Sequence, residues 1–196
     1  GAEGELRGPR QIMRLQQLET EHDNIRAALR WALDSRWTEM ALRLGATLHQ
    51  FWRARGYIRE GRAWLEEALR LADSGVPVAK GEEDNEGQSE DATGGTKVRI
   101  LGNEESAIRN SKSAIARALM GVGVLAASQG DYERARTALE DGLGRFRELG
   151  DKSSTANALR NLGNVLRHSG EISAAWEVLS EGLALARELG DLATLG

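Results

Sequence analysis

Residues 121–126, GVGVLA, have the spacing of a nucleotide-binding motif. They satisfy G-x-G-x-x-A, in which the glycines allow close approach of the backbone to the pyrophosphate of a dinucleotide. Asp141 follows about 20 residues later, where a carboxylate that binds a ribose hydroxyl is expected. This motif requires a preceding strand and glycines at both leading positions. The surrounding sequence therefore decides between a cofactor loop and a packed helix.

The composition argues against several kinds of chemistry. The 196-residue chain has no cysteine, which removes disulfides, thiolate metal sites and thiol nucleophiles. His22, His49 and His168 are far apart in the sequence, and no apolar run approaches the roughly 18 residues of a membrane span. No Ser/His/Asp grouping with a structural context is present. We therefore expect a cytoplasmic protein with no catalytic residues, no metal site, no cofactor, and no direct contact with a membrane or nucleic acid.

Two further groups of residues fit surface and core better than a site. Glu19, Glu21, His22 and Asp23 offer metal or acid–base ligands, but adjacent residues of a helix face different directions. A solvated polar face is therefore expected there. The five tryptophans are expected to pack between helices rather than to form a ligand cage: Trp31, Trp37, Trp52, Trp64 and Trp176.

An internal repeat organises the second half of the chain. Residues 116–155 and 156–195 match at an offset of 40, and the tetrapeptide ELGD recurs at 148–151 and 188–191. Each unit has two stretches of apolar residues at helical spacing, separated by Gly130 or Gly170. The repeat therefore predicts two helix pairs, and within it Gly123 recurs as Gly163 whereas Gly121 becomes Asn161. The nucleotide motif is accordingly interpreted as a coincidence.

These units resemble tetratricopeptide (TPR) repeats. The positions that carry the resemblance in the last unit are Leu159, Leu162, Gly163, Leu166, Ala175, Leu179 and Gly182. A degenerate unit is expected over 41–73, preceded by a long amphipathic helix over 14–34. The resemblance implies an all-α, right-handed α-solenoid of about seven helices with one long inserted loop. The expected divisions are a capping helix and degenerate pair at 1–73, an insertion at 74–113, and two repeats at 114–196.

The first part of the chain also resembles the helical region of bacterial STAND-class regulators. LETEHDNIRAALRWALDS and the residues up to 72 carry this resemblance, in which EHDNIRAAL is the most specific element. Such proteins are multidomain signalling ATPases, often with a transcriptional output domain, and their TPR-like array acts as a sensor. The resemblance implies that this chain is an excised piece of a larger regulator whose ATPase lies outside it.

The insertion differs in composition from the repeats. Residues 82–91, EEDNEGQSED, include six acidic and no basic residues, which is typical of a solvated loop. A short strand or extended segment is possible over 96–102, and residues 103–113 extend the following helix towards its N-terminus. A sharper alternative is that the acidic residues fold over a binding groove as an internal ligand.

A binding groove is expected on the first helix of each unit, by analogy with peptide-binding TPR proteins. The residues predicted to line it are mostly cations and amides: Arg43, Gln50, Arg53, Arg117, Asn157, Arg160, Asn164, Arg167 and His168. Guanidinium and amide groups suit carboxylates and extended peptide backbone because they present several donors in a fixed geometry. The groove is therefore predicted to bind an acidic or extended segment of a protein or peptide. The plainer alternative is a solvated helix surface.

Other functions remain open at this point. The chain is alternatively an oligomerisation or autoinhibitory segment that docks on its own ATPase domains, or a sensor of a small-molecule inducer. The end of the last unit leaves Leu183, Ala186 and Leu189 without a following helix, so self-association through this apolar face is also expected.

Overall fold

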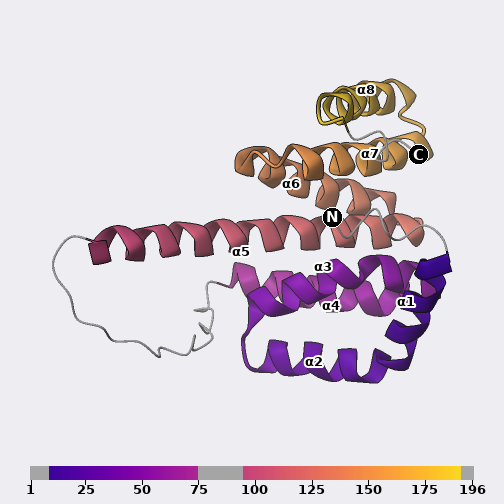
Figure 1. Cartoon of the computed structure of the whole chain (residues 1–196). Helices are drawn as coiled ribbons and strands as arrows, with labels where there is room; N and C mark the ends of the chain where they lie inside the picture. The colour runs from indigo at the N-terminus through magenta and orange to yellow at the C-terminus, as the bar shows by residue number, and fades with distance from the viewer. Residues whose placement is uncertain (1–8, 75–94, 191–196) are drawn as a thin grey trace.

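The computed structural model describes residues 9–74 and 95–190, which form eight α-helices (Figure 1). These are α1 (Pro9–Thr20), α2 (His22–Asp34), α3 (Thr38–Arg55), α4 (Ile58–Asp73), α5 (Gly95–Ser128), α6 (Tyr132–Leu149), α7 (Lys152–His168) and α8 (Ile172–Glu188). The helices pack pairwise, α3 with α4, α5 with α6 and α7 with α8, as TPR helices do. The prediction of an all-α stack of TPR-like pairs is therefore confirmed.

The glycines and aspartates between the repeat helices end and cap these helices as predicted. Gly130 and Gly170, which separate the helices of the two repeats, have φ angles of +76° and +83°, a conformation that glycine adopts at little cost. Asp131 caps α6 by accepting a hydrogen bond from the backbone N–H of Arg134 at 3.3 Å. Asp151 caps α7 through the N–H of Ser154 at 3.0 Å. The turns between helices are thus fixed by local sequence.

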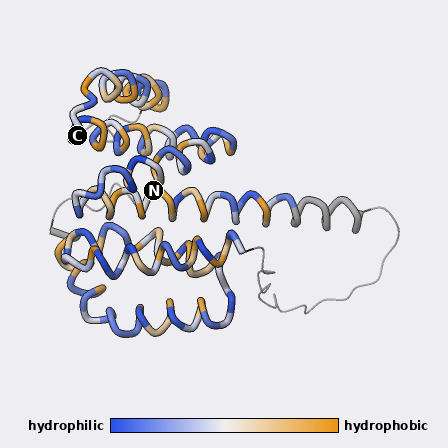
Figure 2. The backbone as a smooth tube through the Cα atoms, turned by 180° about the vertical axis from the view of Figure 1, so that it is seen from behind, coloured by the Kyte–Doolittle hydropathy of each residue, from blue (hydrophilic) through white to orange (hydrophobic). Residues whose placement is uncertain are grey.

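Helix α5 joins two hydrophobic cores. The first core lies among α2, α3, α4 and α5 around Trp52 and Leu65, both fully buried. The second lies among α5, α6, α7 and α8 around Phe146 and Leu139. Hydrophobic and hydrophilic residues alternate along the helices, as Figure 2 shows, because each helix buries one side. The stack is therefore continuous through α5.

Two boundaries differ from the sequence prediction. The single helix expected over 14–34 is two helices, because the chain turns at Glu21 between α1 and α2. Figure 1 shows α1 running in a different direction from α2 along the edge of the stack. The expectation of a strand or extended segment at 96–102 is wrong, because α5 already begins at Gly95. Extending an existing helix needs no new nucleation, whereas an isolated strand has no partner.

The extension of α5 towards its N-terminus is confirmed. Residues 103–113 are helical, and the first half of α5 projects beyond the stacked helices in Figure 1. Residues 105–110 are all exposed, and burial begins at Ala114. The acidic stretch at 82–91 and its predicted role as a solvated loop or internal ligand lie outside the described residues.

The G-x-G-x-x-A glycines pack helices together. No strand precedes them, since residues 121–126 lie inside α5 and are buried. A Cβ atom on Gly123 would lie 2.5 Å from Cγ of Leu139 on α6, and one on Gly121 would lie 2.9 Å from Cδ1 of Leu65 on α4. Gly123 thus allows the close approach of α6, and Gly121 that of the preceding helix pair. The coincidence of the motif is explained by packing on two sides of α5.

Ion pairs of one design connect successive repeats. Arg62 on α4 bonds Asp131, the N-cap residue of α6, at 2.7 Å, and Arg136 on α6 bonds Glu171, the N-cap residue of α8, at 2.8 Å. Each arginine also contacts a glutamate one turn further along its own helix, Arg62–Glu66 at 3.2 Å and Arg136–Glu140 at 2.9 Å. Equivalent residues thus repeat the same two contacts, and we call this series the ion-pair ladder.

Candidate functional site

The predicted groove residues of α3 and α5 differ in how they are held. Arg43 pairs with Glu39 on its own helix at 2.6 Å, and the Gln50 amide lies 2.9 Å from His49 Nε2. Arg53 and Arg117 are exposed and take part in no ion pair among the described residues. Among the predicted groove residues of these two helices, the latter two are therefore the cations most available to a ligand.

The predicted groove residues of α7 form local contacts. Arg160 donates a hydrogen bond to the side-chain oxygen of Asn157 at 2.9 Å, so these two groups are bonded to each other within α7. Arg167 lies 3.1 Å from Nε2 of His168, and the His168 ring stacks on Tyr132 of α6 with planes 2° apart. Asn164 is exposed. His168 thus also helps to pack α7 on α6, while its edge and Arg167 remain exposed.

The middle of the expected groove is closed. Met120 and Val124, which occupy the same template positions on α5, are each 6% exposed because they pack within the stack. Two open depressions of about 560 and 380 Å³ lie elsewhere, beside the turns between paired helices, and share Arg59 and Gln129. None of the nine predicted groove residues lines either depression. The groove prediction therefore concerns an exposed helix surface, not a cavity.

Charge is distributed unequally between the two helices of each pair. Helix α7 carries three basic residues and no acidic residue, and α3 carries three basic residues and one acidic residue. In contrast, α8 has three acidic residues and one basic residue, and α4 has four acidic and three basic residues. The first helices of the pairs therefore form the basic side of the stack.

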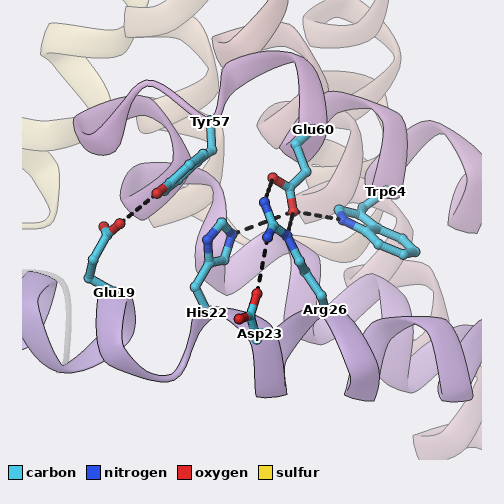
Figure 3. A network of polar contacts seen from close by, with 7 residues as sticks. All are labelled: Glu19, His22, Asp23, Arg26, Tyr57, Glu60 and Trp64. Atoms are coloured by element: carbon cyan, nitrogen blue, oxygen red, sulfur yellow. Dashed lines mark hydrogen bonds and ion pairs between the residues drawn. The ribbon is translucent and has the colours of Figure 1, made fainter.

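A polar network joins the N-terminal helices to the first pair (Figure 3). Arg26 donates to both carboxylate oxygens of Glu60, each at 2.6 Å, and to Asp23 at 3.1 Å. His22 is 5% exposed, and its Nε2 lies 3.4 Å from Glu60. The expectation of a solvated polar face over residues 19–23 is thus wrong for His22, because the turn at Glu21 directs its ring inward. Its ring centroid lies 4.2 Å from that of Tyr57.

The chemistry of this network is that of helix docking. The hydrogen bond from Arg26 is the main reason that the pKa of Glu60 lies below its usual range, with a further bond from Trp64. Glu19 accepts a hydrogen bond from Tyr57 at 2.5 Å, and this bond is the largest cause that raises the pKa of Tyr57. Because Glu60 accepts several donors from its own chain, it is poorly placed to act as a base. His22, Asp23 and Arg26 all belong to EHDNIRAAL, so this sequence element docks α2 on α4.

Two tryptophans and one alanine also differ from expectation. Trp176 on α8 is 74% exposed and Trp31 on α2 is 52% exposed, although both were predicted to pack between helices. Ala186, predicted to lie on an open apolar face, is buried against α7. The exposed large apolar side chains here are Ile172 and Trp176 of α8 and Leu189, its C-cap residue. The repeat indicates that Trp176 is exposed, because it occupies the position of Arg136 one unit earlier.

The described residues form neither a metal site nor a membrane-spanning helix. No group of three or more His, Asp or Glu side chains there is arranged to hold a metal ion. Likewise, none of the helices described combines the length and apolar character that crossing a bilayer requires.

Comparisons with known proteins agree with this architecture. The tetratricopeptide repeat family profile matches residues 114–188, which cover α6, α7, α8 and the packed part of α5. Proteins of Mycobacterium bovis and Mycobacterium tuberculosis, provisionally named HTH-type transcriptional regulators, are 39% identical over 51 residues. That match covers 26% of this chain and only 6% of each relative's length. With two helix pairs of matching geometry in the same span, residues 114–188 are a tetratricopeptide repeat region.

Proposed function

We propose that this chain is a protein-interaction module that binds an acidic, extended segment of a partner on the basic side of the stack. The observation that carries this proposal is the separation of charge: α7 has three basic and no acidic residues, whereas α8 is acidic. Exposed guanidinium groups bind carboxylates through paired hydrogen bonds of fixed geometry. TPR repeats commonly mediate contacts between proteins, and this supports the assignment.

We further propose that the module is the sensing part of a larger STAND-like regulator, without catalytic residues of its own. The EHDNIRAAL element and the partial match to mycobacterial regulators support this placement. The match covers 6% of those relatives, so the sensing role rests on this limited similarity and on the repeat architecture. The exposed basic face is the surface through which such a module would recognise its ligand.

A charge-reversal experiment tests the binding face. The probe is a fluorescein-labelled glutamate-rich peptide, and its affinity is measured by fluorescence anisotropy at several salt concentrations. The double variant Arg117→Glu/Arg167→Glu is expected to lose affinity by about tenfold or more, because each exposed contact of this kind contributes of the order of 1 kcal/mol. Binding by the unaltered chain should weaken as salt increases.

The matched control moves the same charge change to α4. Arg59→Glu/Arg70→Glu alters the net charge by the same amount, and both arginines are exposed but lie off the basic side. This control should lose less than about twofold in affinity if recognition is local rather than a general charge effect. Equal losses in the two variants, or equal binding of a lysine-rich peptide, would disprove the proposed face.

A further inference from the structure

Helix α8 presents an apolar stripe whose first two residues no other described helix covers. Ile172 and Trp176 are 61% and 74% exposed. Leu179 and Leu183 follow at intervals of three and four residues, so the four side chains share one face of the helix. Leu179 packs on Gly163 of α7, where a Cβ atom would lie 2.4 Å from its Cγ, and Leu183 is partly buried. We call Ile172, Trp176, Leu179 and Leu183 the α8 stripe.

The internal repeat shows what such a stripe does. At an offset of 40 residues its members correspond to Tyr132, Arg136, Leu139 and Leu143 of α6. In α6 the first two of these residues receive the next helix pair, because Tyr132 stacks on His168 of α7 and Arg136 bonds Glu171, whereas Leu139 packs on Gly123 of α5. Ile172 and Trp176 thus stand at the same docking positions without a described occupant.

Trp176 makes α8 differ from the two earlier helices at the equivalent position. Both earlier positions of the ion-pair ladder hold arginine, Arg62 and Arg136, each bonded to an acidic N-cap residue of the next pair. The third position holds Trp176, and the accompanying glutamates Glu66 and Glu140 are replaced by Ser180. An acidic N-cap residue would have no cation to meet on α8. The ladder ends there, and the position of Trp176 favours an apolar side chain of the partner opposite it.

We propose that the exposed side of α8 around Trp176 is a homodimer interface, in which α8 packs antiparallel on α8 of a second copy about a twofold axis beside Ser180. Ser173, Trp176, Ser180, Leu183 and Arg187 have the alternating three- and four-residue spacing of helices that pack side by side. In this arrangement Trp176 of each copy faces Leu183 of the other. Ser180 meets its own counterpart, and its small side chain permits the close approach that a large tryptophan beside it needs.

Charge complementarity supports a second copy as the occupant. Arg187 and Glu177 are exposed, and neither is in an ion pair among the described residues. The antiparallel arrangement places Arg187 about one helical turn along the axis from Glu177 of the second copy, and the twofold axis creates this pair twice. The interface uses α8, which belongs to the acidic set of helices, so it does not depend on the proposed peptide-binding face.

Sedimentation velocity over a range of protein concentrations tests self-association. Trp176→Arg restores the residue type of the ladder and should raise the concentration at half-dimerisation by at least about tenfold, as expected for a central aromatic side chain of an interface. Trp31→Arg is the control, because Trp31 is also exposed but lies on α2. It should leave the dimerisation midpoint within about twofold. A chain that stays monomeric throughout, or equal effects of both variants, would overturn the proposal.

Single cysteines test the geometry separately. The chain has no cysteine, so Ser180→Cys introduces a unique thiol beside the proposed axis. A short bismaleimide should cross-link this variant to itself with high yield, whereas Ser173→Cys should not react, because residue 173 lies nearly four helical turns, about 21 Å, from its counterpart in the second copy. Circular dichroism confirms that both variants are folded. Equal cross-linking of the two variants, or none at residue 180, would contradict the antiparallel arrangement.

Discussion

The guanidinium of Arg26 on α2 holds both carboxylate oxygens of Glu60 on α4, and each N–O distance is 2.6 Å. The two residues are 34 positions apart in the sequence, and Glu60 is partly buried beside His22 and Trp64. A bidentate contact of this kind fixes the orientation of both helices, because two parallel hydrogen bonds cannot form after a small rotation. The pair therefore sets how the N-terminal helices join the stack.

Replacing this carboxylate should destabilise the protein at neutral pH and flatten its pH dependence. Glu60→Gln is expected to lower the free energy of unfolding at pH 7 by about 1–2 kcal/mol, through loss of charge-assisted hydrogen bonds. The pKa of Glu60 is lowered in the folded state. Its contribution is therefore fully present above the ordinary glutamate pKa of about 4.3, and is lost as the pH falls through the folded value. Urea denaturation at neutral and acidic pH measures both effects.

The control for this prediction is Glu67→Gln on the same helix. Arg70 also lowers the pKa of Glu67, but both residues lie on α4 and are exposed, so no second helix is held. This variant should lose no more than about 0.5 kcal/mol at pH 7. Equal losses for Glu60→Gln and Glu67→Gln would show that docking of α2 contributes nothing to stability.

The two glycines of the abandoned nucleotide motif should respond differently to alanine. Gly123→Ala places Cβ 2.5 Å from Cγ of Leu139 and 3.1 Å from the backbone oxygen of Ala135, so α6 itself must move. Gly121→Ala meets Cδ1 of Leu65 at 2.9 Å, the end of a flexible side chain. We expect a loss of about 2–3 kcal/mol for Gly123→Ala and about 1 kcal/mol or less for Gly121→Ala, measured by chemical denaturation.

Gly144 on α6 provides the opposite control. No atom lies within 4 Å of a Cβ built there, so Gly144→Ala should stabilise the chain by about 0.5–1 kcal/mol through helix propensity. If all three alanine variants changed stability alike, close packing would not be the reason for Gly123.

The ion-pair ladder can be separated from helix capping at Asp131. This carboxylate accepts the Arg134 N–H and pairs with Arg62, the contact that most lowers its pKa. Asp131→Asn keeps a capping oxygen and should lower the melting temperature only slightly, at low salt. Asp131→Ala loses the cap as well and should lower the melting temperature further. Thermal denaturation at low and high salt checks this, because only the ion-pair component should disappear with salt. A salt-independent loss in the asparagine variant would contradict the ladder.

The repeated part of the fold was predictable because its signals are local. The 40-residue repeat predicts the helix pairs. Helices end at Gly130 and Gly170 because these glycines adopt positive φ angles, and helices begin after Asp131 and Asp151 because their side chains cap the backbone. The turn at Glu21 was not predictable in this way. No glycine or proline marks it, and the interruption brings His22 against Tyr57 and Glu60, which are distant in sequence.

The candidate site was less predictable than the fold. Helical spacing placed the groove residues on one face, but it could not show that Arg43 is paired with Glu39 or that Met120 and Val124 are buried. Those outcomes depend on the neighbouring helices. Composition also gave a misleading expectation for Trp176, because aromatic residues are usually core. Its position in the repeat, where arginine stands one unit earlier, was the better indicator.

The separation of the basic helices α3 and α7 from the acidic helix α8 also affects how fast a partner is found. A body with unlike charge on its two sides has a dipole across its short dimension, and an approaching charged molecule experiences a torque before any contact forms. Encounters with an acidic partner would therefore occur preferentially with α3 and α7 facing it and α8 turned away. The protein's orientation during diffusion, and hence the association rate rather than the lifetime of the complex, would carry most of the salt dependence.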